Sequence, residues 1–81
     1  MFSQFTVCFS SLALMNLNER GVVSNYIERD ESIIRQLINL GILPGLPITL
    51  KKKSPLFTIV IGNQQLEIKQ ELARSISVRV T

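Results

Sequence analysis

The segment that most constrains the fold is a short amphipathic helix pattern with a clear start and a clear stop. Asp30 can cap the first turn with its carboxylate, and Asp30 and Glu31 both suit the positive end of a helix dipole. Apolar residues then recur at spacings of three and four and form one stripe, made of Ile33, Ile34, Leu37, Ile38 and Leu40. We expect this helix to pack its stripe on a sheet.

The residues after the helix predict a sharp stop and a tight turn. Gly41 can take the left-handed conformation that closes a helix, which places Ile42 to fold back onto the last turn. Pro44 and Gly45 then follow in the order of a type II turn, with proline at the second position and glycine at the third. The helix therefore cannot continue beyond Gly41.

The segments on both sides of this helix are short and resemble strands. β-Branched and aromatic residues, often alternating with polar ones, predict strands at residues 6–9, 22–27, 47–53, 57–61, 65–68 and 76–80. Gly62 and Asn63 suit a short hairpin loop, and short helical turns are expected at residues 12–15, after Ser10 and Ser11, and at 71–74. Short strands around one main helix predict a mainly β fold, a small and partly open barrel.

The composition favours a single folded domain over residues 1–81, of which residues 1–4 are expected to be loose. Apolar residues make up 46% of the chain and charged residues 19%, which is too apolar for a disordered chain. Residues 1–18 carry no charge, but polar residues interrupt the apolar ones and the segment lacks the basic N-terminal region of a signal peptide. We therefore expect folded protein there rather than a signal peptide or a membrane span. The single Cys8 fits a reducing compartment, which makes the cytoplasm the expected location.

The residue types that most enzymes and metal sites need are scarce in this sequence. The chain has no histidine and one cysteine, so a general base beside a nucleophile and a zinc or transition-metal site are both unexpected. The acidic residues Glu28, Asp30 and Glu31 fit an exposed loop and helix start, and the glycines are explained by turns and caps. We expect no enzymatic activity, no catalytic residues and no cofactor or metal.

The candidate partner-binding residues are Lys51, Lys52, Lys53, Phe57 and Tyr26. The three lysines supply the excess of positive charge, +3 for the whole chain. They form either an ordinary soluble rim or a positive patch that steers an acidic partner surface or lies near anionic lipid head groups. Phe57 either anchors a partner beside them or is buried in the core, and Tyr26 has the same alternatives. Nucleic-acid binding through the lysines is not expected, because the sequence lacks a basic face interleaved with aromatic residues.

The segment of residues 35–45, RQLINLGILPG, is similar to the helix end of the FeoA family, in which a basic residue and two leucines precede Gly and then Pro-Gly. The order of the surrounding elements also fits that family over about residues 11 to 80. The motif residues Leu40, Gly41, Pro44 and Gly45 are interpreted as structural. The sequence departs from the family at two loops, where the usual glycine near Asn18 is missing and the hairpin after Pro55 is trimmed.

The resemblance implies an SH3-like barrel and a non-enzymatic accessory role in ferrous iron transport. The implied partner is the cytosolic part of the FeoB membrane transporter, which would place the chain in the cytoplasm, peripheral to the inner membrane through its partner. Two alternatives are a regulatory SH3-like module acting on a transcription factor, because related domains end iron-dependent repressors, and a generic protein-binding barrel. Self-association through Phe2, Phe5 and Phe9 is a further hypothesis, since small barrels bury little surface.

Overall fold

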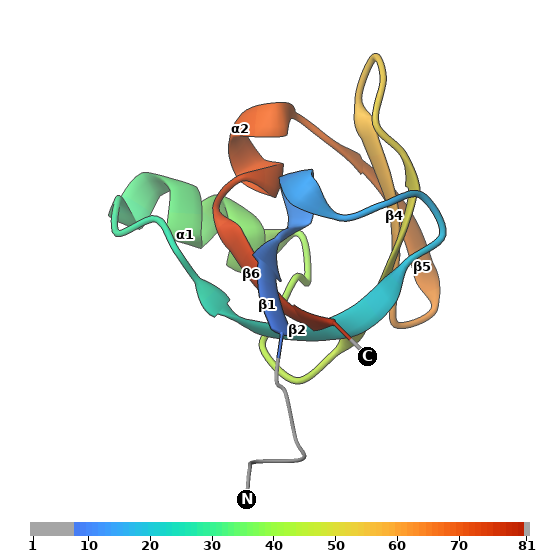
Figure 1. The fold of residues 1–81 in the computed structure, drawn as a ribbon. Coiled ribbons are helices and arrows are strands. Elements are labelled where there is room, and N and C mark those ends of the chain that lie inside the picture. Colours follow the sequence, from blue (N-terminus) through green and yellow to red (C-terminus); the bar gives the residue numbers. More distant parts are fainter. Residues whose placement is uncertain (1–7, 81) are drawn as a thin grey trace, which may run out of the picture.

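A computed structural model describes residues 8–80 as one curved antiparallel sheet with three short helices (Figure 1). The strands are β1 (Cys8–Ser11), β2 (Arg20–Tyr26), β3 (Pro47–Lys52), β4 (Phe57–Ile61), β5 (Gln64–Ile68) and β6 (Ile76–Val80). The helices are the 3-10 helix η1 (Leu12–Leu14), α1 (Glu31–Asn39) and α2 (Gln70–Ala73). The strand order across the sheet is β1-β6-β2-β3-β4-β5.

The sheet curls around a single aliphatic core and stays open between its two edge strands, β1 and β5. Inward positions alternate along the strands, as at Ile48 and Leu50 of β3 and at Ile76 and Val78 of β6. The buried core consists of Leu12, Met15, Val23, Leu37, Ile42, Ile48, Leu50, Phe57, Ile59, Ile61, Ile68, Leu72, Ala73, Ile76 and Val78. Each fully buried Leu, Ile or Val contributes about 1.5–3 kcal/mol of transfer free energy. The predicted mainly β, partly open barrel is confirmed.

Predicted and observed strand boundaries differ by two residues at most. The 57–61 and 76–80 strands are confirmed as predicted, and the two-residue loop Gly62–Asn63 joins β4 to β5, where Ile61 pairs with Gln64. The described part of the first strand runs from Cys8 to Ser11, and the predicted residues Thr6 and Val7 lie outside the described residues. The expectation for residues 1–4 also lies outside them.

The start and stop of α1 match the sequence pattern in atomic detail. The Asp30 carboxylate accepts a hydrogen bond from the Ser32 amide at 2.8 Å, as an N-cap should. Gly41 has φ +83, and the amides of Gly41 and Ile42 donate to the carbonyls of Ile38 and Leu37, both at 3.0 Å. This pair of bonds is the Schellman motif, and Ile42 packs into the core beside Leu37. The predicted helix stop is confirmed.

The turn after α1 also has the predicted geometry. The Leu46 amide donates to the Leu43 carbonyl at 3.3 Å, and Gly45 between them has φ +94, as a type II turn requires at its third position. The Gly45 amide donates to the Val23 carbonyl, and the Val23 amide donates to the Leu46 carbonyl, so the turn is held against β2. The chain returns from α1 directly beside the strand that it left.

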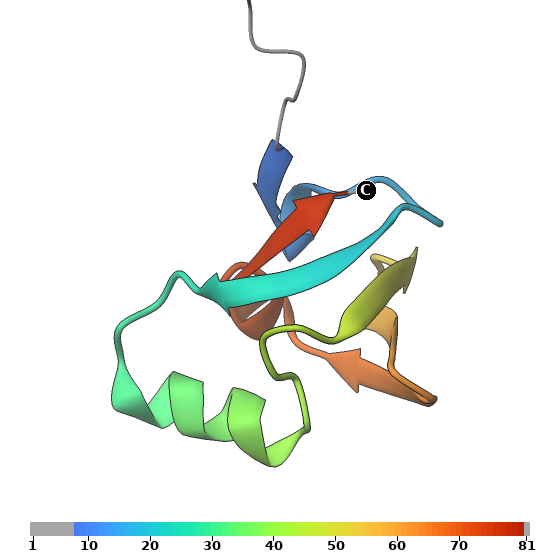
Figure 2. The same cartoon turned by 90° about the horizontal axis from the view of Figure 1, so that it is seen from below.

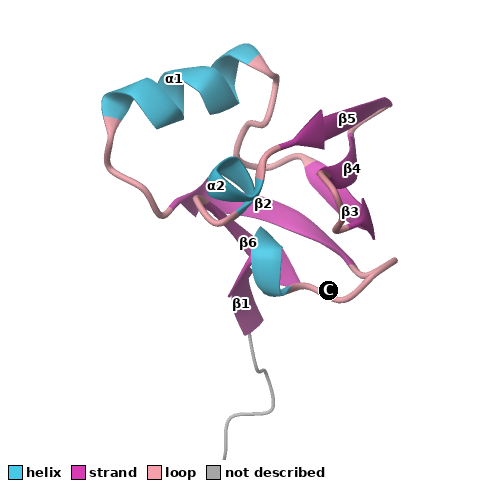
Figure 3. Ribbon diagram, turned by 90° about the horizontal axis from the view of Figure 1, so that it is seen from above, coloured by secondary structure: helices cyan, strands magenta, loops and turns pink. Residues whose placement is uncertain are grey.

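The helix α1 packs against the core of the barrel through only part of its apolar stripe. Leu37 is the one fully buried residue of α1, Ile33 and Leu40 are half-buried, and Ile38 is 48% exposed. Figures 2 and 3 show α1 beside the barrel and not across a face of the sheet. The reason is topological. The helix α1 connects β2 and β3, which are antiparallel neighbours, so the chain leaves the sheet and re-enters it at adjacent strand ends and does not cross a face of the sheet.

Candidate interaction surface

The three candidate lysines lie on the hairpin that joins β3 to β4, which projects beyond the barrel (Figure 1). All six residues from Lys51 to Leu56 are exposed. Leu50 pairs with Ile59 while Lys52 pairs with Thr58, so Lys51 is the extra residue of a β-bulge. A bulge bends its strand and increases the local twist, and here it lies where the hairpin leaves the core. The lysines are therefore carried on a projecting arm, away from the buried residues.

Two exposed leucines lie next to these lysines. Leu56 follows the turn of the hairpin and is 38% exposed, and Leu17 is 54% exposed in the loop before β2. The Asn18 amide donates to the Leu50 carbonyl at 2.6 Å, and the Leu50 amide donates to the Glu19 carbonyl at 3.2 Å. These bonds hold the loop of Leu17 against β3, immediately before the first lysine. Asn18 has φ +68, a conformation that asparagine tolerates and that the missing glycine would also adopt.

The two aromatic candidates are placed differently from the lysines. Phe57 is 5% exposed and belongs to the core, so its side chain does not reach the surface beside the lysines. Tyr26 is half-buried at the end of β2, and its hydroxyl donates to the Ile42 carbonyl at 2.8 Å. This bond ties β2 to the chain that follows α1. The structure therefore brings Lys51, Lys52 and Lys53 together on the surface and leaves Phe57 and Tyr26 in supporting positions.

The single tyrosine of the chain allows a direct test of this tie. Burial raises the pKa of Tyr26 above its ordinary value of 10.0, because the tyrosinate would lose hydration. We expect titration of tyrosine absorbance to show a higher midpoint in the folded chain than in the denatured chain. The stabilising contribution is fully present below the unfolded pKa, near 10, and is lost as the pH rises through the folded pKa. Equal midpoints in both states would contradict the buried position.

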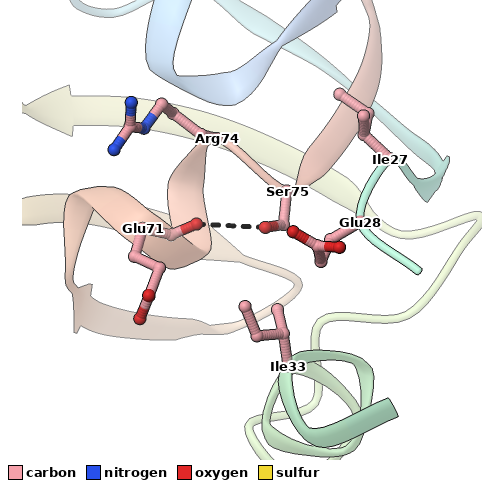
Figure 4. Close-up of a pocket in the computed structure, with 6 residues that line it drawn as sticks. All are labelled: Ile27, Glu28, Ile33, Glu71, Arg74 and Ser75. Atoms are coloured by element: carbon pink, nitrogen blue, oxygen red, sulfur yellow. Dashed lines mark hydrogen bonds between the residues drawn. The ribbon is translucent and has the colours of Figure 1, made fainter. Parts of the chain in front are cut away.

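A second feature of the surface is a cleft of about 360 Å³ between the start of α1 and the corner that joins α2 to β6 (Figure 4). Its lining residues are Ile27, Glu28, Ile33, Glu71, Arg74 and Ser75. The Ser75 hydroxyl donates to the Glu71 carbonyl at 3.0 Å, and Glu28 Oε1 accepts from the amides of Arg29 and Asp30 at 2.8 and 3.1 Å. These polar groups stabilise the local backbone. Sequence patterns missed the cleft, because its residues come from three separate elements.

Residues 8–80 contain neither a cluster of metal-ligating side chains nor a helix that could span a membrane. No group of three or more His, Cys, Asp or Glu side chains in this part of the chain is placed to hold a metal ion. No helix within the same residues is long and apolar enough to cross a membrane. The hypothesis of self-association stays a prediction, since Phe2 and Phe5 lie outside the described residues, while Phe9 is 58% exposed on β1.

Several solved structures share this fold. A crystal structure titled Iron Uptake Regulatory Protein (FeoA) matches with a TM-score of 0.80 and 24% identity, over 91% of this chain and all of that chain. FeoA of Stenotrophomonas maltophilia, crystallised with zinc and described as a prokaryotic SH3 domain protein, matches with a TM-score of 0.69 and 20% identity over 89% of each chain. A manganese-dependent transcriptional repressor matches with a TM-score of 0.83 and 15% identity, over 94% of this chain and 44% of the repressor. The partly open barrel is therefore SH3-like.

Sequence comparison adds the family to the fold. A curated protein of Leptolyngbya boryana, named "Putative Fe(2+) transport protein A", is 32% identical over 78 residues, which is 95% of each chain. The name of this relative links the family to ferrous iron transport. The family model described as FeoA domain matches residues 10–80. Because that match spans the whole barrel from β1 to β6, the chain belongs to the FeoA domain family.

Proposed function

We propose that this chain is a non-enzymatic accessory protein of ferrous iron transport that binds the cytosolic part of the FeoB transporter. The observation that carries the proposal is family membership over residues 10–80, together with a relative of nearly equal length that is named for Fe(2+) transport. In this function the chain works in the cytoplasm and reaches the inner membrane through its partner. Its contribution is binding, for which a small rigid barrel with a projecting basic hairpin is suited.

The lysines of the hairpin are proposed to guide the encounter with the membrane-bound partner. Lys51, Lys52 and Lys53 are exposed, so the field of this basic patch extends about one Debye length, roughly 8–10 Å, into solution. Such a patch raises the association rate with an acidic surface more than it raises the affinity. Phe57 and Tyr26 support the hairpin and β2 from inside, because Phe57 packs in the core and Tyr26 is hydrogen-bonded to Ile42.

A titration of the chain with the purified cytosolic GTP-binding domain of the transporter tests this function. We expect saturable binding by calorimetry, and an association rate lowered at least about 10-fold in the triple variant Lys51→Gln, Lys52→Gln, Lys53→Gln. The matched control replaces Arg29, Arg35 and Arg74, which are exposed on the α1 and α2 side, by glutamine. Both variants lower the formal net charge from +3 to 0, since each removes three positive charges. Absence of binding by the unmodified chain at high concentration would sink the proposal.

A second candidate function follows from the fold likeness to the transcriptional repressor. The chain covers 44% of that repressor, so the likeness concerns one part of a larger protein. A free barrel of this kind could bind a transcription factor in place of the factor's own SH3-like part. A pulldown with an iron-dependent repressor from the same organism separates the two functions, because retention of the repressor and not of the transporter domain would favour regulation.

A further inference from the structure

We propose that the tip of the β3–β4 hairpin binds the head-group region of an anionic lipid bilayer. The surface consists of Lys51, Lys52, Lys53 and Leu56, together with Leu17 from the adjacent loop, and we call it the basic tip. The inference deepens the proposed function and rests on it for the cellular setting, a membrane that holds the transporter. The lipid contact itself is a property of this chain, so it can be tested without any protein partner.

The residues of the basic tip are open to solvent. The hairpin projects from the barrel (Figure 1), and its six residues from Lys51 to Leu56 are all exposed. Leu17 lies one residue from Asn18, whose amide donates to the Leu50 carbonyl at 2.6 Å, and Lys51 follows Leu50 directly. The backbone of the Leu17 loop therefore contacts β3 just before the lysine run, and the exposed Leu56 follows the run by three residues. Such an arrangement lets lysine ammonium groups meet phosphates while leucine side chains enter the acyl boundary.

The two carboxylates nearest the basic tip, Glu19 and Glu67, are fewer than its three lysines, so this region keeps a net positive charge. Glu19 is half-buried, and its Oε1 accepts a hydrogen bond from the Asn16 amide at 2.9 Å, so it is engaged with its own loop. Glu67 on β5 pairs with Thr58, which in turn pairs with Lys52. Two strand spacings separate Glu67 from Lys52, roughly 10 Å, which is about a Debye length at physiological salt. The lysines can therefore attract an anionic surface.

Composition favours a lipid surface over a protein as what the basic tip contacts directly, whereas steering of the protein partner acts through the long-range field and needs no such contact. The energetically important residues of protein interfaces are enriched in Trp, Tyr and Arg, and lysine is depleted there. The exposed hairpin residues 51–56 have the sequence KKKSPL, which contains no Trp, Tyr or Arg. Juxtamembrane lysines, in contrast, are attracted to the negative potential of acidic lipids, and exposed leucines add an apolar contribution. Charge plus aliphatic insertion is the combination that peripheral membrane binding needs.

Co-sedimentation with lipid vesicles tests the proposal directly. The full chain is incubated with vesicles of phosphatidylcholine alone and with vesicles of equal parts phosphatidylcholine and phosphatidylserine. We expect binding to the phosphatidylserine vesicles only, weakened by added salt. The triple variant Lys51→Gln, Lys52→Gln, Lys53→Gln should bind these vesicles about 100-fold more weakly, because each lysine contributes roughly a fivefold increase in affinity. The control variant at Arg29, Arg35 and Arg74, with the same net charge, should bind like the unmodified chain.

Insertion of the leucines has its own measurement, because the chain contains no tryptophan. The variant Leu56→Trp places a single fluorophore at the hairpin, and its emission should shift to the blue on phosphatidylserine vesicles and be quenched by brominated lipid. The control Ile38→Trp places the fluorophore on α1, where the native side chain is 48% exposed, and should show neither change. Inorganic phosphate added at constant ionic strength should not displace the chain, which separates a bilayer from free phosphate as the ligand.

Three results would overturn the lipid contact: equal binding to both kinds of vesicle, full binding by the lysine variant, and an unchanged Leu56→Trp spectrum. Failure of the lipid proposal can be told apart from failure of the proposed transporter binding. If the chain ignores vesicles but binds the soluble transporter domain in a manner that depends on the lysines, the basic tip meets protein and the lipid inference is wrong. If the chain binds phosphatidylserine vesicles but not the transporter domain, the lipid contact stands and the transporter partner is wrong.

Discussion

Replacing Gly21 by alanine should destabilise the chain by about 3 kcal/mol or more, the upper end of the range for overpacked cores. A Cβ atom at Gly21 would lie 2.5 Å from Val78 Cγ1 and 2.6 Å from the carbonyl oxygen of Arg79. Neither neighbour can move easily, because Val78 is fully buried and β6 pairs with β1 on one side and β2 on the other. The clash therefore separates β2 from β6, two strands inside the sheet.

Urea denaturation followed by circular dichroism measures this effect. A domain of this length has a total stability of roughly 4–12 kcal/mol, so the loss should be a large part of the total. Val22→Ala is the matched control, because Val22 is the next residue of the same strand and is half-exposed. Its replacement by a smaller side chain creates no clash. We expect its cost to be well below that of Gly21→Ala. A Gly21→Ala variant with the stability of the unmodified chain would mean that β2 and β6 do not approach so closely.

Truncation of Leu37 to alanine should also destabilise the chain strongly, by about 3 kcal/mol within the usual range of 2–5 for a buried leucine. Leu37 is the one fully buried side chain of α1 and joins the core of the barrel. Removing it opens a cavity between α1 and the strands, and the half-buried Ile33 and Leu40 are left to hold the helix. The same urea denaturation measures the total cost.

Hydrogen exchange distinguishes loss of the helix from loss of the whole fold. In Leu37→Ala we expect amides of α1 to exchange faster than those of β3 and β4, because the helix lies beside the barrel and has one main anchor. Ile38→Ala on the same helix is the control, since that side chain is 48% exposed and its removal leaves no cavity. Equal stability of the two variants would contradict the role of Leu37 as the anchor of α1.

Local signals in the sequence were enough to predict the secondary-structure elements and the family. Asp30 and Gly41 set the ends of α1 because a cap and a Schellman motif depend on residues within one turn of the helix. The strands followed from alternation over a few residues, which explains why the predicted ends differ from the observed ones by no more than two. The order of these local signals was also sufficient to identify the FeoA resemblance, which the family model confirmed.

Which residues share a surface could not be predicted in this way and depends on the three-dimensional fold. Whether Phe57 pointed inward depended on the pairing of β4 with both of its neighbours, and the position of α1 depended on the pairing of β2 with β3. The contact between the loop of Leu17 and the strand before Lys51 joins residues more than thirty positions apart through two backbone hydrogen bonds of Leu50, with Asn18 and Glu19. Local periodicity carries no information on such long-range contacts, because they arise from the curvature and register of the sheet.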